Sequence, residues 1–396
     1  MNMNEQMKES EESILHTYNR FPVVFEKGQG CYLYDSEGKE YLDFAAGIAV
    51  NSLGYHYPGY DEALKDQIDK LMHISNLYYN EPIIEAGAKL VKAGKMSKAF
   101  FTNSGTEAIE GALKAAKKYA YVRDGHADHE IIAMNHSFHG RSIGALSVTG
   151  TAHYREPFEP LMGGVKFADF NDLESVKAQI TDKTCAIITE VVQGEGGIYP
   201  AKKEFLEGLR QICDEKDIML IFDEIQCGMG RTGHYFAWQA YGVQPDIMTS
   251  AKALGCGVPV GAFVLGEKAA KASLEPGDHG TTYGGNPFVC AAVSKVFDIY
   301  ENDKIIEHVQ EMTPYLEQKL DEIVAKHECA ATRRGMGFMQ GIVIQGRPVG
   351  EVVKAALAKG LLVISAGSDV LRIVPPLVIT KEHIDKMAAI LDECME

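Results

Sequence analysis

Short apolar runs alternate with amphipathic stretches through the middle of the chain, and this alternation constrains the fold more than any other feature. The apolar runs are Lys98–Phe101, Glu130–Met134, Cys185–Glu190, Met219–Asp223 and Ile247–Ser250. Between most of them lie longer stretches with helical periodicity, such as Ala108–Tyr121 and Lys203–Glu215. Strands that alternate with helices over roughly 200 residues predict an α/β fold, in which a mostly parallel sheet is sandwiched by helices.

The two ends of the chain have a different pattern. The first 20 residues are polar and helix-prone, and two short strands are expected at Cys31–Asp35 and Gly38–Phe44, joined by a turn. In the C-terminal part, helices are predicted at Asp303–Lys326 and Val352–Lys359, and strands at Met339–Ile344 and Leu361–Ser365. We therefore expect a smaller α+β domain from about residue 300 onward.

Composition excludes several classes of partner. The chain has 396 residues and a formal net charge of −16, which argues against nucleic acid or an anionic membrane surface as a partner. No apolar stretch approaches the roughly 20 residues that cross a bilayer, and the polar beginning Met1–Gln6 is not expected to be a secretion signal. The eight cysteines are scattered without a CxxC pair, which predicts reduced thiols and a cytoplasmic location.

Two residues near the middle of the chain suggest pyridoxal phosphate chemistry. Asp223 ends an apolar run, so its carboxylate is placed to face a cationic ring nitrogen. Lys252 lies among small residues, where a cofactor aldehyde could reach its amine. These are the acidic partner and the Schiff-base amine that pyridoxal phosphate needs. Asp223-Glu224 also fits a magnesium-binding strand of a nucleotidase, but the chain lacks the G-x-x-x-x-G-K-[ST] loop.

The segment that follows the first apolar run offers a phosphate site. Ser104-Gly105-Thr106 opens a helix, and a helix N-terminus supplies free N–H groups and the positive end of the helix dipole. The alternative is a capping box that holds no ligand.

Three further segments carry side chains that suit a substrate or a ring. After the next strand, Phe138 could cover a flat ring and Arg141 could bind a carboxylate through a bidentate fork. The alternatives are a core phenylalanine with a surface arginine, or a metal site at His136 and His139, for which no third ligand is nearby. Glu195 lies in a glycine-rich loop after a strand, and Arg372 lies in an apolar run, where a buried arginine requires a partner such as Glu195.

Taken together, six motifs resemble the ornithine and acetylornithine branch of the class III aminotransferases, which have the fold of type I pyridoxal phosphate enzymes. The matching segments occur in order at Asn103–Ala108, Phe138–Arg141, Gln193–Gly197, Asp223–Gly233, Ser250–Gly255 and Thr281–Pro287. The resemblance covers the chain from about Tyr18 to Pro376. It implies an N-terminal segment at 1–58 that packs with the small domain, a large cofactor-binding domain at 59–297 and a C-terminal small domain at 298–396.

The resemblance implies roles for the cofactor-binding residues. Lys252 would bind the cofactor covalently and move a proton, and Asp223 would pair with the ring nitrogen. The other residues expected to hold the cofactor are Gly105 and Thr106 at the phosphate, Phe138 on the ring, Gln226 at the ring hydroxyl, Glu224 and Ile225 beside them, and Thr282 from a neighbouring subunit. The resemblance therefore implies a homodimer with shared sites and no metal.

The resemblance also implies an exchange between two different substrates. An ω-amine donor leaves its nitrogen on the cofactor, and 2-oxoglutarate collects it as glutamate. Glu195 and Arg372 would neutralise each other while the donor is bound, and Arg372 would be released to bind the α-carboxylate of 2-oxoglutarate. Arg141 would hold the α-carboxylate of the donor and then the distal carboxylate of 2-oxoglutarate. Thr281 and Tyr18 complete the substrate-binding residues expected from the resemblance.

The donor is inferred from two short segments, Ala46–Asn51 and Gln226–Gly230, and from the compact length of the chain, all of which resemble the acetylornithine enzymes. Ornithine enzymes have a tyrosine where this chain has Ile48, and Ala46–Asn51 resembles the acetylornithine enzymes instead. This implies N-acetylornithine as the donor, in arginine biosynthesis. Ornithine, 4-aminobutyrate, succinylornithine and succinyldiaminopimelate stay open as donors, as do an aminomutase and a non-catalytic binding protein with the same fold. The chain departs from the family at Gly54–Pro58, at Ile109 and at Gly111.

Overall fold

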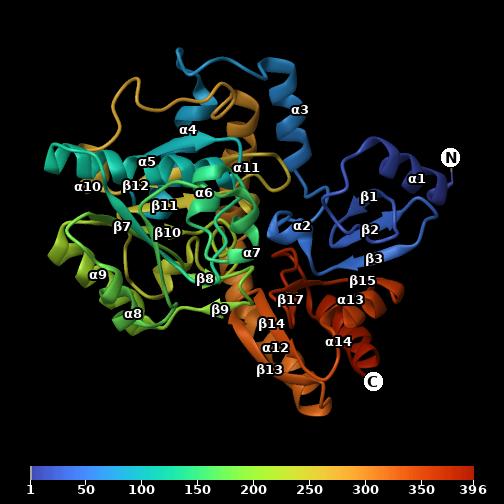
Figure 1. The fold of residues 1–396 in the computed structure, drawn as a ribbon. Helices are drawn as coiled ribbons and strands as arrows, with labels where there is room; N and C mark the ends of the chain where they lie inside the picture. Colours follow the sequence, from blue (N-terminus) through green and yellow to red (C-terminus); the bar gives the residue numbers. More distant parts are fainter. Residues whose placement is uncertain (1) are drawn as a thin grey trace.

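A seven-stranded sheet forms the centre of the larger part of the molecule, in the computed structural model, which describes residues 2–396 (Figure 1). Met1, the first residue of the polar beginning, lies outside the described residues. The strand order is β4 (Lys98–Thr102), β12 (Gly261–Leu265), β11 (Ile247–Ser250), β10 (Met219–Asp223), β7 (Thr184–Glu190), β5 (Glu130–Met134) and β6 (Val165–Ala168). β12 runs antiparallel to both neighbours and the other pairs are parallel. The mostly parallel sheet predicted from the sequence is therefore confirmed.

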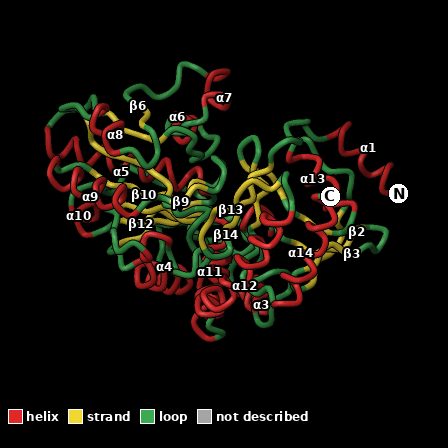
Figure 2. The backbone as a smooth tube through the Cα atoms, turned by 90° about the horizontal axis from the view of Figure 1, so that it is seen from below, coloured by secondary structure: helices red, strands yellow, loops and turns green. Residues whose placement is uncertain are grey.

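Helices cover both faces of this sheet, because alternate residues of its strands point to opposite sides. In β10, Met219 and Ile221 join a buried cluster with α5 (Gly105–Asp124), whereas Leu220 and Phe222 join the larger cluster that includes α9 (Lys203–Lys216). The strands lie between helices when the molecule is viewed from below (Figure 2). Both amphipathic stretches predicted from the sequence are therefore helices.

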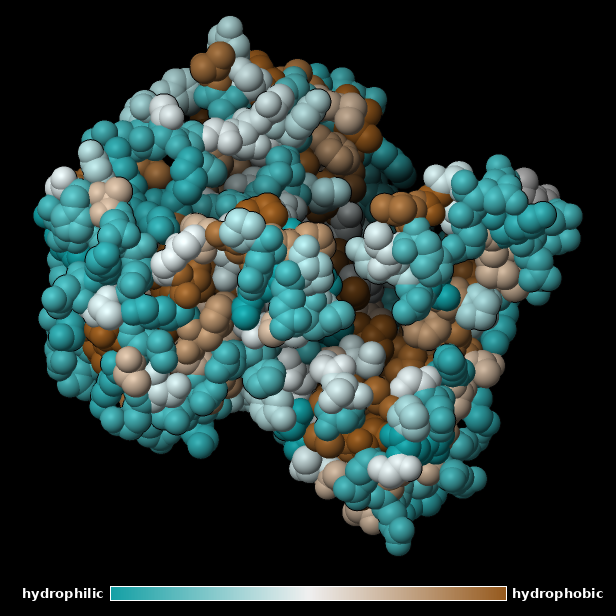
Figure 3. All heavy atoms as spheres, in the orientation of Figure 1, coloured by the Kyte–Doolittle hydropathy of each residue, from teal (hydrophilic) through white to brown (hydrophobic). Residues whose placement is uncertain are grey.

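The two ends of the chain meet in a smaller lobe. One sheet has the order β1 (Phe25–Gln29), β2 (Tyr32–Asp35), β3 (Glu40–Asp43) and β15 (Leu361–Leu362), so a C-terminal strand pairs with the N-terminal hairpin. The other sheet has the order β13 (Ala330–Met336), β14 (Met339–Ile344), β17 (Val370–Ile373) and β16 (Ile364–Ala366). Between the lobe and the larger part, the surface is hollowed and lined by apolar side chains (Figure 3).

The remaining elements connect these sheets. The helices are α1 (Met3–Ser13), α2 (Ala46–Ala49), α3 (Tyr60–Lys70), α4 (Glu81–Gly94), α6 (Ile143–Ser147), α7 (Ala152–Arg155), α8 (Leu173–Gln179), α10 (Glu267–Lys271), α11 (Pro287–Asn302), α12 (Ile305–Lys326), α13 (Val349–Ala358) and α14 (Lys381–Met395). A short hairpin is formed by β8 (Val192–Gln193) and β9 (Tyr199–Pro200), and 3-10 helices occur at η1 (Glu156–Phe158), η2 (Ala237–Ala240) and η3 (Lys252–Leu254). Among the described residues, no helix has the length and apolarity that would let it cross a membrane.

Two expectations need correction. The single strand predicted at Leu361–Ser365 is divided into β15 and β16, which belong to different sheets. An apolar run does not specify its partners, and here its two halves pair with strands from opposite ends of the chain. The strand β12 was missed, although it lies between β4 and β11 in the sheet. The predicted domain boundaries at 58 and 297 stay predictions, and α11 runs through the second of them.

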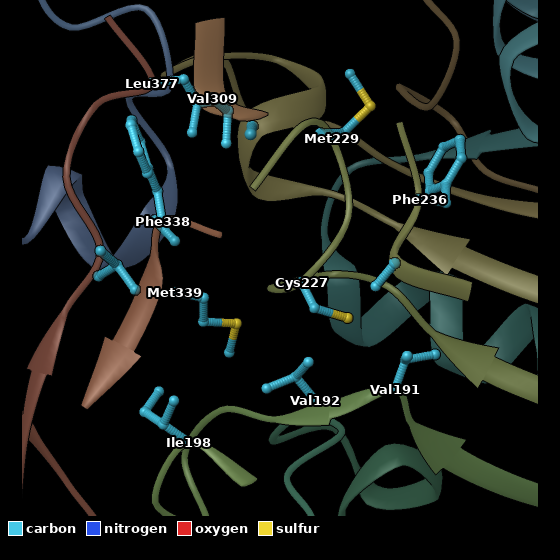
Figure 4. Close-up of a cluster of buried hydrophobic side chains, with 14 of the residues drawn as sticks. Val191, Val192, Ile198, Cys227, Met229, Phe236, Val309, Phe338, Met339 and Leu377 are labelled. Atoms are coloured by element: carbon cyan, nitrogen blue, oxygen red, sulfur yellow. The ribbon is translucent and has the colours of Figure 1, made fainter. Parts of the chain in front are cut away.

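One apolar core links the larger part to the lobe. Figure 4 shows Val191 at the end of β7 and Cys227 and Met229 of the loop after β10, together with Phe338 and Leu377 of the C-terminal part. These side chains are buried and belong to one hydrophobic cluster. Because burial of this cluster removes apolar surface of both parts from water, the lobe is held at a defined position beside the ends of the sheet strands.

Candidate active site

A cavity of about 490 Å³ opens at the carboxyl ends of the central strands. This is the edge of an open α/β sheet where ligands bind, because the loops after neighbouring strands diverge there. The lining residues are Val50, Asn103, Ser104, Gly105, Thr106, Phe138, His139, Gly140, Arg141, Glu190, Asp223, Ile225, Gln226, Ala251, Lys252, Gly257, Val258, Pro259 and Val260. They come from segments far apart in the sequence, and most of the predicted site residues are among them.

Lys252 lies two residues after the end of β11, at the first position of η3. Its φ of 50° is left-handed, a strained backbone conformation for a residue with a side chain. Burial disfavours its charged form, and this lowers the pKa of the amine to about 8, although Glu195 acts in the opposite direction. A lysine amine with such a pKa is a better nucleophile at neutral pH than an ordinary one.

Asp223 ends β10 and is held by three donors. Its Oδ1 accepts hydrogen bonds from the Ile225 N–H at 2.9 Å and the Thr249 hydroxyl at 3.2 Å. Its Oδ2 lies 2.7 Å from Nδ1 of His139, which is also buried. The carboxylate is thus fixed in place before any ligand binds.

His139 is the partner of Asp223, and the sequence did not predict this contact. The alternative of a metal site with His136 is not supported, because His139 directs a ring nitrogen at Asp223 and His136 is absent from the cavity lining. Within residues 2–396, the cluster of metal-ligating side chains is instead Asp124, His126 and His129, at the far end of α5. The sequence indicates that a buried carboxylate requires donors and that His139 follows another strand, but it does not show that the two side chains meet.

The N-terminus of α5 borders the cavity as predicted. Ser104 is the N-cap and accepts a hydrogen bond from the Glu107 N–H at 3.3 Å, but the Glu107 carboxylate accepts from the Asn103 N–H and not from that of Ser104, so the reciprocal capping box is not formed. The Thr106 hydroxyl accepts a hydrogen bond from the Ser142 N–H at 3.1 Å. A Cβ on Gly105 would lie 2.9 Å from Cδ1 of Ile225, so the glycine lets the helix end approach the strand loop.

Phe138 and Arg141 also line the cavity, in the loop that contacts Thr106 through Ser142. The guanidinium of Arg141 is 3.9 Å from the centre of the Tyr154 ring and 5.4 Å from that of Phe138. These cation–π contacts orient the guanidinium while leaving its N–H groups free to bind a carboxylate. Tyr154 was not predicted, and a lone tyrosine in a short helix offers no signal for such a role.

Glu195 and Arg372 are in contact, as the sequence led us to expect. Nη1 of Arg372 donates to Oε1 of Glu195 at 2.5 Å and to Oε1 of Gln226 at 3.1 Å. The amide of Gln226 donates to the same Glu195 oxygen at 3.3 Å. Burial would raise the pKa of Glu195, but the Arg372 charge and hydrogen bond outweigh it and hold that pKa below its usual value.

Glu190 lines the cavity but was not predicted. It ends β7 and lies in register with Asp223 on the neighbouring strand. Its Oε2 accepts a hydrogen bond from the Phe138 N–H at 3.2 Å, and its Oε1 accepts one from the Gly194 N–H at 3.1 Å. Burial and the nearby Asp223 raise the pKa of this carboxyl to about 7.

Glu224 is not placed where the sequence led us to expect. Its side chain is fully buried outside the cavity, and its carboxylate accepts 2.8 Å hydrogen bonds from the N–H groups of Ala237 and Trp238. Successive residues after a strand point to different sides, so Asp223 and Ile225 reach the cavity while Glu224 anchors η2. Its expected contact with the cofactor is therefore corrected to a structural role.

Three further predicted residues lie apart from the cavity within one chain. Thr281 and Thr282 line a separate hollow beside α5, where the Thr281 hydroxyl accepts a hydrogen bond from the Asn103 amide at 3.2 Å. Tyr18 precedes β1 and is 72% exposed, so it contacts solvent rather than the other site residues. Roles for these residues would require a second subunit or a movement of the N-terminal segment.

Comparisons with known proteins agree with this geometry. The model of the class III aminotransferase family matches residues 14–395. An acetylornithine aminotransferase of Clostridium acetobutylicum is 47% identical over 98% of the chain and 100% of its own length. Two solved structures are similar: the ornithine aminotransferase of Toxoplasma gondii (TM-score 0.95, 28% identity, 100% of this chain and 95% of that one) and the N-acetylornithine aminotransferase of Stenotrophomonas maltophilia (TM-score 0.84, 35% identity, 98% of each chain).

Proposed function

Because the chain belongs to the class III aminotransferases, we propose that it transfers the ω-amino group of N-acetylornithine to 2-oxoglutarate. The products are N-acetylglutamate 5-semialdehyde and glutamate, and the reaction is a step of arginine biosynthesis. The observation that carries the proposal is the contact between Glu195 and Arg372, which both bond to the cavity residue Gln226 and whose charges act on Lys252. The name of the Clostridium acetobutylicum relative supports the choice of donor.

The cofactor of this class of enzyme is pyridoxal phosphate, and the cavity suits it. The residues that would hold it include Lys252, whose amine has a pKa lowered to about 8, and Asp223, whose carboxylate lies at the end of a strand. Gly105 and Thr106, at the helix N-terminus, suit the phosphate. Phe138 and Ile225 supply apolar surface on the cavity wall, and Gln226 is close enough to serve as a polar contact.

When bound, the cofactor supplies an electrophilic carbon and an electron sink for amine transfer. The residues of the chain then have distinct tasks. Asp223, fixed by His139, Thr249 and the Ile225 N–H, would face the ring nitrogen of the cofactor. Lys252 accepts and returns a proton at the carbon that carries the transferred nitrogen, because its amine is neutral for part of the time at physiological pH.

The Glu195–Arg372 pair allows one cavity to accept two unlike substrates. The donor presents an ω-amine and needs no cation near it, so Arg372 stays neutralised by Glu195. 2-Oxoglutarate presents a carboxylate, which replaces Glu195 as the partner of Arg372. Arg141 holds the second carboxylate, with its orientation set by Tyr154. An aminomutase has no need to admit 2-oxoglutarate, so this pair favours an aminotransferase.

The apolar wall near α2 favours an acetylated donor. Val50 lines the cavity, and the preceding residues Ala46–Ala49 are apolar or glycine. No group of this segment would pair with the charged α-amino group of free ornithine, whereas an acetyl group can pack against it. Ornithine, succinylornithine, succinyldiaminopimelate and 4-aminobutyrate are the alternative donors that the experiment below distinguishes.

A homodimer with shared sites completes the proposal. Thr282 lies outside the cavity of its own chain, as expected if it binds the phosphate in the partner's site. Leu77, Tyr78 and Tyr79 are 87%, 64% and 95% exposed, so the single chain presents a large apolar surface. Exposed apolar surface of this kind marks a contact with another protein. The eight free thiols are consistent with action in the cytoplasm.

The test is a half-reaction that follows the absorbance of the cofactor in the purified enzyme. We expect N-acetylornithine to convert the cofactor to its amine form at least about tenfold faster than ornithine or 4-aminobutyrate, since the charged α-amino group of ornithine finds no partner. We expect 2-oxoglutarate to restore the original form. Rapid conversion by another donor alone would change the proposed substrate, and no conversion by any donor would refute the proposal.

Two variants connect this test to the structure. Lys252→Ala should abolish both half-reactions. Glu195→Gln should slow the donor half-reaction by at least about tenfold, because it leaves Arg372 as a buried and uncompensated cation. The same variant should retain the half-reaction with 2-oxoglutarate, which pairs with Arg372 directly. Equal loss in both half-reactions would contradict the role of the pair.

A further inference from the structure

Glu190 is a buried acid in the cavity wall that the chemistry above does not use. It is 4% exposed, and its two carboxylate oxygens accept backbone hydrogen bonds from Phe138 and Gly194. No salt bridge to this carboxylate occurs among the described residues. A buried carboxyl group without a cation is costly for stability, so its presence at this position points to another role.

The two hydrogen bonds join the loop that carries Arg141 to the loop that carries Glu195, the partner of Arg372. Phe138 is three residues before Arg141 and contacts its guanidinium. Gly194 is the residue before Glu195, which pairs with Arg372. Glu190 itself ends a central strand, which is one of the most buried parts of the sheet. A single side chain at the end of a buried strand thus connects the loop of Arg141 with the loop of Glu195.

The backbone at Gly194 has little room to move. A Cβ on Gly194 would lie 2.5 Å from Cδ of Gln226, so the backbone of the loop packs directly on the amide that contacts Glu195 and Arg372. A displacement of Gly194 would therefore displace the whole acid–arginine pair. On the other side, a displacement of Phe138 would move Arg141.

We propose that Glu190 is a positioning residue that sets the separation between Arg141 and the Glu195–Arg372 pair, and thereby selects the chain length of the dicarboxylate acceptor. The inference rests on the proposed function, because it assumes that the two arginines bind the two carboxylates of one acceptor. Glu190 acts through the two loops and does not touch the substrate.

The test shortens the connecting side chain with Glu190→Asp, which withdraws the carboxylate by about 1.5 Å, the length of one C–C bond. Two readouts are compared with the wild type. The first is protection against thermal unfolding by the non-reacting diacids succinate, glutarate and adipate. The second is kcat/KM for the 2-oxo diacids of four, five and six carbons. We expect the preference for the five-carbon acid to change by at least about tenfold in both readouts, since one methylene in a fitted site is worth that much.

Glu224→Asp is the matched control. Glu224 is also fully buried at a strand end and also accepts two backbone hydrogen bonds, from Ala237 and Trp238, but it lies outside the cavity. Both variants should unfold at a lower temperature than the wild type. Glu224→Asp should change the protection by the three diacids by one common factor, and kcat/KM for the three 2-oxo diacids by another. The order of the chain lengths is then kept in both readouts.

Three outcomes decide the inference. A uniform loss across chain lengths in Glu190→Asp, like that of the control, would mean that Glu190 is structural only and would overturn it. If Glu190→Asp does not fold, Glu190→Gln keeps the length and one acceptor oxygen, and an altered chain-length preference in that variant supports the inference while an unaltered one refutes it. A wild type without transamination would refute the proposed function instead. Protection by the non-reacting diacids would still show whether Glu190 affects the preference for chain length.

Discussion

At the scale of single residues, two buried basic groups of the site, Arg372 and Lys252, have opposite properties. Arg372 is buried but stays compensated, because Glu195 lies 2.5 Å from its Nη1. Lys252 is also buried, but the nearby carboxylates only partly offset the cost of removing its charge from water. Its pKa therefore falls to about 8. One group is thus held as a charge for binding a carboxylate, and the other is made available as a neutral amine.

The lowered pKa of Lys252 predicts how fast the apoenzyme captures pyridoxal phosphate at different pH values. A protonated amine is not nucleophilic, so the rate should rise about tenfold per pH unit below pH 8 and level off above it. Absorbance after rapid mixing measures this rate. In Glu195→Gln the plateau should begin at a lower pH, because the Glu195 charge raises the pKa of Lys252. A rate that continues to rise to pH 10 would contradict the prediction.

At the scale of elements, α5 connects the phosphate site to the sheet. Its first turn borders the cavity, and its body packs against β12, where Gly111 meets Phe263. A Cβ on Gly111 would lie 2.2 Å from a ring carbon of Phe263, which is buried and stacked on Phe100. Gly111, a position where the chain departs from the family, therefore leaves room for the large side chain of Phe263 in the adjacent strand.

Gly111→Ala should destabilise the protein by overpacking. The new methyl group requires Phe263 or the helix to move, which costs about 1–3 kcal/mol in the free energy of unfolding. Denaturant unfolding monitored by circular dichroism measures it. The control is Gly87→Ala in α4, where the nearest atom would be 3.9 Å away and the change should be neutral or stabilising by about 0.5–1 kcal/mol. Equal effects of the two substitutions would show that α5 does not depend on close packing at Gly111.

At the scale of the whole molecule, the site is assembled from distant parts of the chain. The cavity joins loops of the large sheet with Val50 near the N-terminus, while Arg372 comes from β17 in the lobe. The buried cluster of Figure 4 holds the lobe against the sheet, and the pairing of β3 with β15 joins the two chain ends within the lobe. The exposed segment Leu77–Tyr79 is the surface where we expect a second subunit to complete the site.

Tyr79→Arg should weaken this association. Tyr79 is 95% exposed in the single chain, so the change should leave the subunit folded but bury an unpaired charge in the dimer. Analytical ultracentrifugation should show a shift toward monomer, and activity per subunit should fall by at least about tenfold at low protein concentration. Val122→Arg on α5, where the side chain is 53% exposed, is the control. A fully active monomer would contradict shared sites.

Several parts of the site were predictable because they depend on local chemistry. Asp223 at the end of an apolar run and Ser104–Thr106 at a helix start are positions that the sequence pattern itself defines. Lys252 was identified by its small neighbours and by the motif around it. The alternation of strands and helices likewise determined the mostly parallel sheet, because a strand of period two and a helix of period 3.6 place their apolar residues differently.

Other features were decided by the tertiary structure, because they depend on which residues meet. The sequence could not show that His139 holds Asp223, that Glu190 joins the Phe138 and Gly194 loops, or that Glu224 points away from the cavity. It also could not show that one apolar run supplies strands to two sheets. Side-chain direction after a strand end and the pairing of distant strands depend on long-range packing. The sequence thus determined the chemistry of the site, and the tertiary structure determined its geometry.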